Sequence, residues 1–458
     1  MEKFMSFIGI FVQIGICYAI STNRKKVDWK LVVMGFALQL GFALLILKTE
    51  AGQSFFQMMN GVIVTLLGFT QKGAGFVFGN LTGLNIPVGE AIIPAGSGIP
   101  AEMADLNCTG MVALYARPGA FFAFAVLPTI IFFSSFMAIL YHAGIMQRVV
   151  YYVAWVMQKT MKTSGAESLS AAANIFVGQT EAPLVIRPYI NKMTLSELNC
   201  IMVGGMATIA GGVMAAYVGM LRSKFPEIAG HLMAASVMSA PAAMVFAKII
   251  VPEVEQPATA GQVTLNVEKV DQNLIDAAAR GASEGLSLAL NVAAMLIAFI
   301  ALIELGNHAW GGICTYAMKI IPVNLAAIDS FQELLGYLNA PLAWMMGVPT
   351  KDLLVAGQIL GEKTVINEFV AYAHLGKIIN GEEILNGAKV VLDKRTWIIM
   401  TYACCGFANF GSIGIQLGGI GGLAPERRGE LAKLGIRALI AGTFASYATA
   451  NIAGMIVD

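Results

Sequence analysis

Long apolar stretches recur along the chain and are separated by shorter polar segments. Six of them have about the length that an α-helix needs to cross a bilayer. They are Phe4 to Ile20, Leu31 to Leu47, Gly119 to Tyr141, Leu232 to Ile250, Leu286 to Leu305 and Thr396 to Gln416. This pattern predicts an all-α polytopic membrane protein.

Two stretches, about Ser164 to Tyr189 and about Pro341 to His374, are rich in polar and small residues although apolar sequence flanks them. Each has room for two half-helices and a turn, which predicts a re-entrant hairpin, because irregular backbone at membrane depth is tolerated only against protein or a wet cavity. Each is followed by an apolar span that glycines interrupt, at Thr208 to Gly219 and at Cys405 to Gly419. Such paired, interrupted segments indicate an inverted-repeat transport domain with its site near the membrane midplane.

Two connecting segments are more polar. Between Glu50 and Arg117, the amphipathic part SFFQMMNGVIVTLLGF predicts an interfacial helix, and the Gly/Pro-rich part from Leu84 to Cys108 predicts an external loop of unassigned role. Glu253 to Asp271 is expected to be a cytoplasmic linker. The sequence thus predicts five regions. Residues 1–163 hold scaffold helices with the interfacial helix and the external loop, and residues 226–340 hold scaffold and linker including the sixth span. The first hairpin and broken helix occupy 164–225, the second hairpin and broken helix occupy 341–422, and a C-terminal span occupies 423–458.

Composition and charge support a membrane protein and set its orientation. Hydrophobic residues make up 57% of the chain and charged residues 12%, roughly half the charged share of an average soluble protein. Basic residues close three short loops, Asn23 to Lys30, Arg148 to Lys162 and Arg427 to Arg437, which marks their side as cytoplasmic. With eight spans, both termini then lie on the outer side. The net charge of +1 argues against a nucleic-acid binder.

The cysteines and histidines suggest neither a metal site nor an enzyme. The six cysteines are scattered, without a CxxC pair or histidines at ligand spacing, and the four histidines form no pairing with a nucleophile. We therefore expect no disulfide framework, no cofactor and no enzymatic activity.

Glu181 and Glu368 are the two carboxylates inside the predicted hairpins. Burying a carboxylate in a membrane costs about 2.5 to 3.5 kcal/mol on insertion scales, so each is a candidate functional residue. Hydrogen-bonding neighbours accompany both, namely Gln179 and Thr180 for the first and Thr364 and Asn367 for the second. Together they suit a polyhydroxylated or heterocyclic solute. The structural alternative is that the carboxylates pair with Arg187, Lys192 or Lys363 and only fix the hairpins.

Asn174 and the Thr208 hydroxyl, with carbonyls freed where a helix is interrupted, could surround a small cation such as sodium with oxygen ligands. Alternatively, Asn174 caps the second half-helix of its hairpin. In the second broken span, Gly406 and Gly411 favour an unwound helix that presents Asn409, Ser412 and an aromatic ring to a cavity. That ring, Phe407, could stack on a base or could be an ordinary core residue.

Three long motifs closely resemble the concentrative nucleoside transporter family. They are GQTEAPLVIRPY at Gly178 to Tyr189, NEFVAY at Asn367 to Tyr372 and CGFANFGSIG at Cys405 to Gly414. The similarity continues over nearly the whole chain. It implies eight transmembrane helices with two re-entrant hairpins, interfacial helices, a homotrimer, and nucleoside uptake driven by a cation gradient.

The resemblance also implies roles for individual residues. Nucleobase contacts fall on Gln179, Thr180 and Glu181, with Val213 and Leu288 as apolar walls. Ribose contacts fall on Glu368, Asn409 and Ser412, and Phe407 lies against the ligand. Sodium ligands are the side chains of Asn174 and Thr208 and the backbone oxygens of Val177 and Ile209.

The sequence thus predicts a secondary active symporter that imports nucleosides such as uridine, adenosine or cytidine across a bacterial inner membrane. Sodium is the expected co-transported ion. Two alternatives stay open: proton coupling through Glu181 or Glu368, and, from a different class, a nucleoside-gated channel or receptor.

Overall fold

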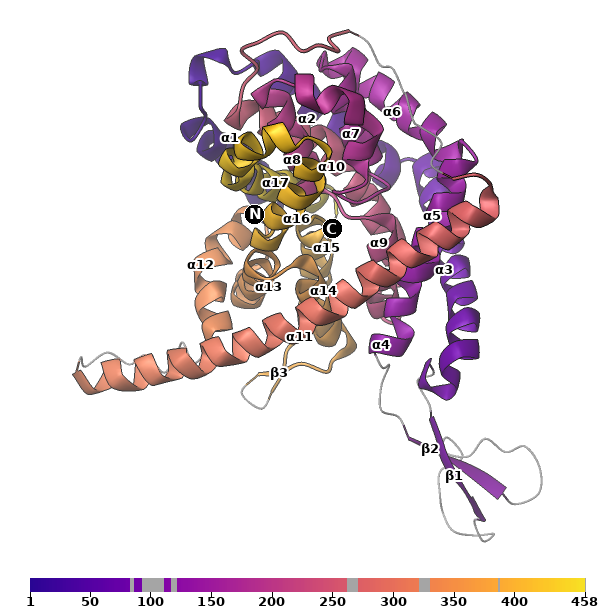
Figure 1. Cartoon of the computed structure of the whole chain (residues 1–458). Helices are drawn as coiled ribbons and strands as arrows, with labels where there is room; N and C mark the ends of the chain where they lie inside the picture. The colour runs from indigo at the N-terminus through magenta and orange to yellow at the C-terminus, as the bar shows by residue number, and fades with distance from the viewer. Residues whose placement is uncertain are drawn as a thin grey trace.

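The computed structural model describes residues 1–82, 86–92, 111–116, 122–261, 271–320, 330–385 and 388–457. Within these ranges the chain is almost entirely helical, as the sequence predicts (Figure 1). Two short antiparallel strand pairs are the exception. They are β1 (Ile86–Ile92) with β2 (Met111–Ala116), and β3 (Ile384–Leu385) with β4 (Ala388–Lys389).

The N-terminal part begins with three helices, α1 (Glu2–Ala19), α2 (Trp29–Lys48) and α3 (Glu50–Phe78). Polar side chains start the second and third helices: Asp28 accepts from the backbone of α2, and Thr49 accepts from Gly52 N of α3. The remaining elements before the first hairpin are the 3₁₀ helices η1 (Arg24–Lys26) and η2 (Gly79–Thr82), and helices α4 (Phe122–Ala125), α5 (Leu127–His142) and α6 (Ile145–Met161). Most of the predicted external loop lies outside the described residues, but Ile86–Ile92 forms a strand.

The first predicted hairpin and broken span are both present. Helix α7 (Gly165–Ala173) and the 3₁₀ helix η4 (Ala182–Lys192) form the two arms of the hairpin around an irregular tip. Helix α8 (Leu195–Ala207) stops at Thr208, and the chain resumes as α9 (Gly211–Leu221). Helix α10 (Ile228–Ile250) follows.

The second half repeats this order of elements. Helices α13 (Leu353–Val365) and α14 (Glu368–Asn380) form the second hairpin, and α15 (Lys394–Cys404) and α16 (Phe410–Leu423) form the second broken span before α17 (Arg428–Ile456). The hairpin begins later than predicted, because Pro341 lies inside a separate helix, α12 (Phe331–Met345). The other elements of this half are η5 (Thr350–Asp352), η6 (Pro425–Arg427) and the long helix α11 (Leu274–Ile320), which runs obliquely across the molecule in Figure 1.

The two halves are inverted relative to each other. At the start of α8, Ser196 Oγ donates to Val251 O beyond the end of α10, and Thr22 N of the α1–α2 loop donates to Ile250 O. At the start of α15, Arg395 instead meets the two chain ends: it donates to Val457 O at 2.8 Å and lies 3.7 Å from a Glu2 oxygen. Helices α8 and α15 therefore begin at opposite ends of the molecule, and both termini lie at the end away from the first basic loop.

Eight helices in the described ranges are long and apolar enough to cross a membrane, matching the predicted number. The eight helices differ from the predicted spans in two places. Helix α3 qualifies although its sequence predicts an interfacial helix, so its placement at the interface remains a prediction. The predicted span from Thr396 to Gln416 does not qualify, because the break between α15 and α16 leaves two short helices.

Candidate functional site

A cavity of about 1200 Å³ lies between the first hairpin, α5, the start of α9 and α11. Four of the predicted nucleoside and sodium contacts line it: Val177, Thr180, Glu181 and Leu288. Ser134 and Tyr141 of α5 and Asn291 of α11 add polar groups to its wall. Polar and apolar residues line the cavity in about equal number, so it is more polar than the usual small-molecule pocket and suits a ligand with many hydrogen-bonding groups.

Glu181 is exposed to this cavity at the tip of the hairpin. Its carboxylate accepts from the backbone N–H of Gly178, which closes the tip onto itself. Among the described residues, no ion pair joins Glu181 to Arg187 or Lys192, or Glu368 to Lys363. The alternative in which these carboxylates only pair with nearby cations is therefore not what the structure shows.

A continuous line of buried hydrogen bonds runs from the first hairpin to the second. Gln416 Nε2 donates to Gln179 Oε1 at 3.0 Å, and Gln179 Nε2 donates to Ser412 Oγ at 3.1 Å. Asn409 caps α16 by accepting from Ser412 N at 2.8 Å, and its own Nδ2 donates to Glu368 Oε2 at 3.2 Å. This line brings together Gln179, Ser412, Asn409 and Glu368, which the sequence assigned to one ligand.

Glu368 begins α14 at the tip of the second hairpin and is buried. Its other oxygen accepts from Tyr217 OH of α9 at 2.9 Å. Each carboxylate oxygen can accept more than one hydrogen bond. The carboxylate thus keeps acceptor capacity for a hydroxyl-bearing ligand while two protein donors fix its orientation.

Six predicted ligand contacts do not line the cavity, namely Gln179, Glu368, Asn409 and Ser412 of the hydrogen-bond line, and Val213 and Phe407. Val213 is buried in α9, one helical turn before Tyr217. Phe407 is half-buried in the break before α16, where its backbone N–H donates to Thr208 O at 3.2 Å. That bond links the two broken spans at the level of their interruptions.

The four predicted sodium ligands lie at the tip of the first hairpin and at the break after α8. Asn174 Nδ2 donates to Ser170 O at 3.0 Å, while its buried Oδ1 has no hydrogen-bond partner among the described residues. In the same described part of the chain, no donor reaches the backbone oxygens of Val177 and Ile209. Unused buried oxygens are costly unless something else binds them. These residues therefore fit a hard cation that prefers oxygen ligands.

The alternative in which Asn174 caps the second half-helix of the hairpin is wrong, since Asn174 is the C-cap of the first arm. Asn174 stands at the C-terminal end of α7, whereas the second arm of the hairpin begins at Ala182. The Thr208 hydroxyl currently donates to Gly204 O at 3.0 Å, which leaves its lone pairs available as a ligand.

Charged groups also line the cavity. Arg280 of α11 donates two hydrogen bonds to the Asp271 carboxylate, at 2.6 and 2.8 Å, and one to Glu284 at 2.7 Å. This bidentate pairing holds the pKa of the Asp271 carboxyl below its usual range. Arg280, Asp271 and Glu284 all line the cavity. The ion pairs thus fix the segment before α11 to the first turns of that helix.

Three family models match this chain. The C-terminal model of Na⁺-dependent nucleoside transporters matches residues 231–454, the N-terminal model of the same family matches residues 8–81, and a nucleoside-recognition gate model matches residues 123–224. An uncharacterized transporter of Haemophilus influenzae is 41% identical over 459 residues, covering 100% of this chain and 98% of that protein. The chain belongs to the concentrative nucleoside transporter family.

Concentrative nucleoside transporters of known structure share this fold. CNTnw in an inward-facing substrate-bound state is 38% identical, with a TM-score of 0.83 over 100% of this chain and 98% of that one. A doubly substituted variant of CNTnw in an outward-facing state gives the same TM-score. Solute carrier family 28 member 3 of Rattus norvegicus is 40% identical over 100% of this chain, but the chain spans only 59% of that relative's length. Members of this family are transporters and not enzymes.

Tyr217 and Gln416 form hydrogen bonds to the predicted site residues Glu368 and Gln179, and the sequence analysis missed both. Gln416 follows Asn409 and Ser412 at positions i+7 and i+4 of α16, which is the spacing of one helical face. That polar face in an otherwise apolar helix was a usable signal. The sequence around Tyr217 gave no such signal, because its hydrogen-bond partner Glu368 is 151 residues away in the chain.

Proposed function

We propose that the chain is a secondary active symporter that imports nucleosides with a sodium gradient. One observation carries the proposal: the tip of the first hairpin, residues 174–181, holds both the unused oxygens suited to a cation and the polar side chains suited to a nucleoside. The cation oxygens and the nucleoside side chains lie close together in the chain, since Asn174 and Gln179 are five residues apart on one short irregular segment.

A shared hairpin tip provides the coupling. Irregular backbone costs conformational entropy to order. If sodium binding orders residues 174–178, the neighbouring residues 179–181 are partly ordered as well, and nucleoside binding then costs less conformational entropy. Nucleoside binding at 179–181 lowers the entropy cost of sodium binding in the same way. Such reciprocal coupling is typically about 1 to 3 kcal/mol.

The nucleoside is expected to bind across the two hairpins. Gln179, Thr180 and Glu181 are assigned to the base, with Val213 and Leu288 as apolar walls. Glu368, Asn409 and Ser412 are assigned to the ribose, with Phe407 against the ligand. An analogue that lacks one polar partner leaves a buried group unsatisfied, at a cost of about 1 to 3 kcal/mol. The hydrogen-bond line from Gln416 to Tyr217 supports this arrangement because it joins both assigned subsites.

Alternating access is proposed to move the two hairpin-bearing repeats, about residues 164–225 and 341–422, against a scaffold of the remaining spans. The cavity reaches His142, Gln147 and Asp271, close to the basic segment of α6. That end is assigned to the cytoplasm because basic residues gather there. The arrangement therefore supports an inward-facing state. The homotrimer, the inner-membrane location and the periplasmic termini are further parts of the proposal, which rest on the family resemblance and on the basic loops.

Initial rates of uptake test the coupling ion. Purified protein in liposomes is given radiolabelled uridine or adenosine with an inward gradient of sodium chloride, an equal gradient of choline chloride, or an inward proton gradient without sodium. We expect uptake to follow sodium at constant pH, because the cation ligands are neutral oxygens that bind sodium without a titratable group. Stimulation by protons alone would assign the coupling to Glu181 or Glu368 instead.

A further inference from the structure

The two helices that carry the proposed sodium ligands start with the same capping box. Ser164 N donates to Glu167 Oε1 at 2.7 Å, and Glu167 N donates back to Ser164 Oγ at 3.4 Å at the start of α7. At the start of α8, Thr194 N donates to Glu197 Oε2 at 2.9 Å, and Glu197 N donates to Thr194 Oγ1 at 3.1 Å. Both helix ends are thus fixed by their own side chains.

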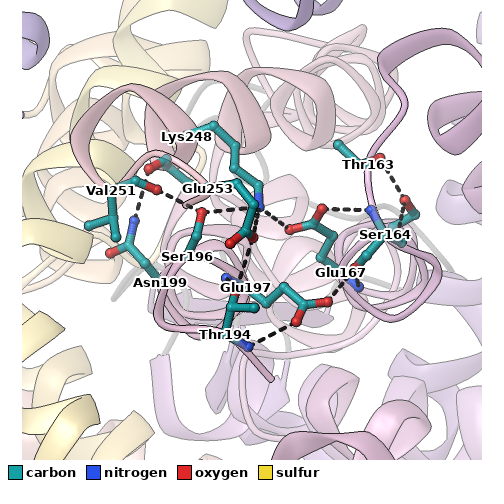
Figure 2. Close-up of polar contacts among 12 residues, drawn as sticks. Thr163, Ser164, Glu167, Thr194, Ser196, Glu197, Asn199, Lys248, Val251 and Glu253 are labelled. Atoms are coloured by element: carbon teal, nitrogen blue, oxygen red, sulfur yellow. Dashed lines mark hydrogen bonds and ion pairs between the residues drawn. The ribbon is translucent and has the colours of Figure 1, made fainter. Parts of the chain in front are cut away.

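The two capping boxes are also joined to each other (Figure 2). Ser164 Oγ donates to Glu197 Oε1 at 2.5 Å, so the cap of α7 is bonded to the capping box of α8. Glu167 and Glu197 are both buried. Hydrogen bonds to charged acceptors are stronger than those between neutral groups, and burial shields this one from water.

Lys248 of α10 adds a third point of attachment. Its buried ammonium lies 2.8 Å from Glu167 Oε2 and 3.2 Å from Glu253 Oε2, and it donates to Ser196 Oγ at 3.1 Å. Figure 2 shows this side chain extended between the starts of α7 and α8. We refer to Ser164, Glu167, Thr194, Glu197 and Lys248 as the hairpin joint.

The hairpin joint sets the register between the two helices at the cation ligands. Asn174 is ten residues after Ser164, and Gly204 is ten residues after Thr194. At a rise of about 1.5 Å per residue, both positions lie roughly 15 Å from the joint. A Cβ placed on Gly204 would lie 3.3 Å from Asn174 Nδ2, so the helices touch at this level, and Gly204 O accepts the Thr208 hydroxyl.

We infer that the hairpin joint is a positioning device for sodium, which rests on the proposed sodium coupling. It holds α7 against α8 so that the Asn174 and Thr208 oxygens face each other at ligand distance before the ion arrives. A slip of either helix would separate the oxygens without touching the nucleoside contacts on α14 and α16. The joint residues bind neither ligand and act only through the two helices.

The test compares variants that loosen the joint with variants that keep it. Ser164→Asp retains an N-cap acceptor for α7 but sets a second carboxylate against Glu197. Lys248→Met removes the ammonium that links α10 to Glu167. Ser164→Thr keeps the hydroxyl and is the conservative control.

A joint at the second hairpin supplies a matched control for location. Asp352 Oδ2 accepts from Thr396 Oγ1 at 2.5 Å and from Asp393 N at 2.9 Å, which ties the start of α13 to the start of α15. Asp352→Asn loosens that hairpin, which carries Glu368 but no proposed cation ligand.

Sodium dependence of uridine uptake is measured at saturating uridine, and uridine dependence at saturating sodium. We expect Ser164→Asp and Lys248→Met to raise the half-saturating sodium concentration about tenfold, the usual effect of losing a group that orients ligands. Ser164→Thr and Asp352→Asn should leave the sodium dependence unchanged. The half-saturating uridine concentration should stay unchanged in both Ser164 variants and in Lys248→Met.

Two results would overturn the inference. Unchanged half-saturating sodium in Ser164→Asp, with only less folded protein or a lower maximal rate, would give the joint a purely stabilising role. An equal sodium shift in Asp352→Asn would mean that any loosened hairpin produces it. If Lys248→Met cannot be purified, the paired Ser164 variants decide the question. If uptake by the wild-type protein does not depend on sodium, the proposed sodium coupling is refuted, and the proposed role of the hairpin joint is refuted as well.

Discussion

Uridine uptake by Glu368→Gln is expected to fall about 10- to 100-fold at low uridine, since a hydrogen bond to a charged group contributes about 1.5 to 3 kcal/mol. The carboxylate accepts from Tyr217 and Asn409 and has acceptor capacity left for ribose hydroxyls. A glutamine replaces one acceptor oxygen with an NH₂ group, which faces a protein donor and cannot accept from a hydroxyl. The measurement is competition of uridine uptake by 2′,3′-dideoxyuridine. The wild-type protein should discriminate against this analogue, and the variant should not.

Glu362→Gln is the matched control for this prediction. Glu362 is a buried carboxylate of the same hairpin, and it pairs with His374 Nδ1 at 2.8 Å, away from the hydrogen-bond line. This variant should retain discrimination against dideoxyuridine. Full uptake and full discrimination by Glu368→Gln would remove Glu368 from the ribose site.

Asn174→Ala is expected to raise the sodium concentration for half-maximal uptake by about 10- to 100-fold. The substitution deletes the Asn174 oxygen proposed to bind sodium, and the interaction of a polar group with a charged one contributes about 1.5 to 3 kcal/mol. Asn174 Oδ1 has no protein partner among the described residues, so its removal costs the resting fold little. The uridine affinity at saturating sodium should change much less. The measurement is sodium-dependent uptake at saturating uridine.

Asn199→Ala provides the comparison for Asn174→Ala. Asn199 is a buried asparagine of α8 whose Nδ2 donates to Ala247 O at 3.1 Å, so its removal also deletes one amide hydrogen bond. We expect its sodium dependence to match that of the wild type. If Asn174→Ala also keeps wild-type sodium dependence, Asn174 is not an ion ligand.

Hairpins and broken helices could be predicted from the sequence because both depend on local composition. Polar residues at Gln179 to Glu181 and glycines at Gly406 and Gly411 interrupt apolar stretches, and interruptions at membrane depth have few structural solutions. The carboxylate Glu368 stood out for the same reason. Composition is less informative for α3, since an amphipathic stretch and a spanning helix overlap in apolarity.

Contacts between distant segments could not be predicted. Ser164 with Glu167, and Thr194 with Glu197, each form a local S/T-x-x-E capping signature, but nothing in the sequence says that the two capping boxes meet. Tyr217 and Glu368 belong to different repeats, and their pairing follows from how α9 packs on α14. The register of packed helices is a property of the whole fold, so the hairpin joint and the complete hydrogen-bond line appear only in three dimensions.

Accumulation of nucleoside tests the central claim most directly. Liposomes containing the purified wild-type protein receive radiolabelled uridine or adenosine under an inward sodium gradient at constant pH, and the internal concentration is followed to steady state. A sodium-coupled symporter raises the internal concentration above the external one and loses this excess when an ionophore dissipates the gradient. An internal concentration that only reaches the external value, with or without sodium, would contradict symport and indicate a channel.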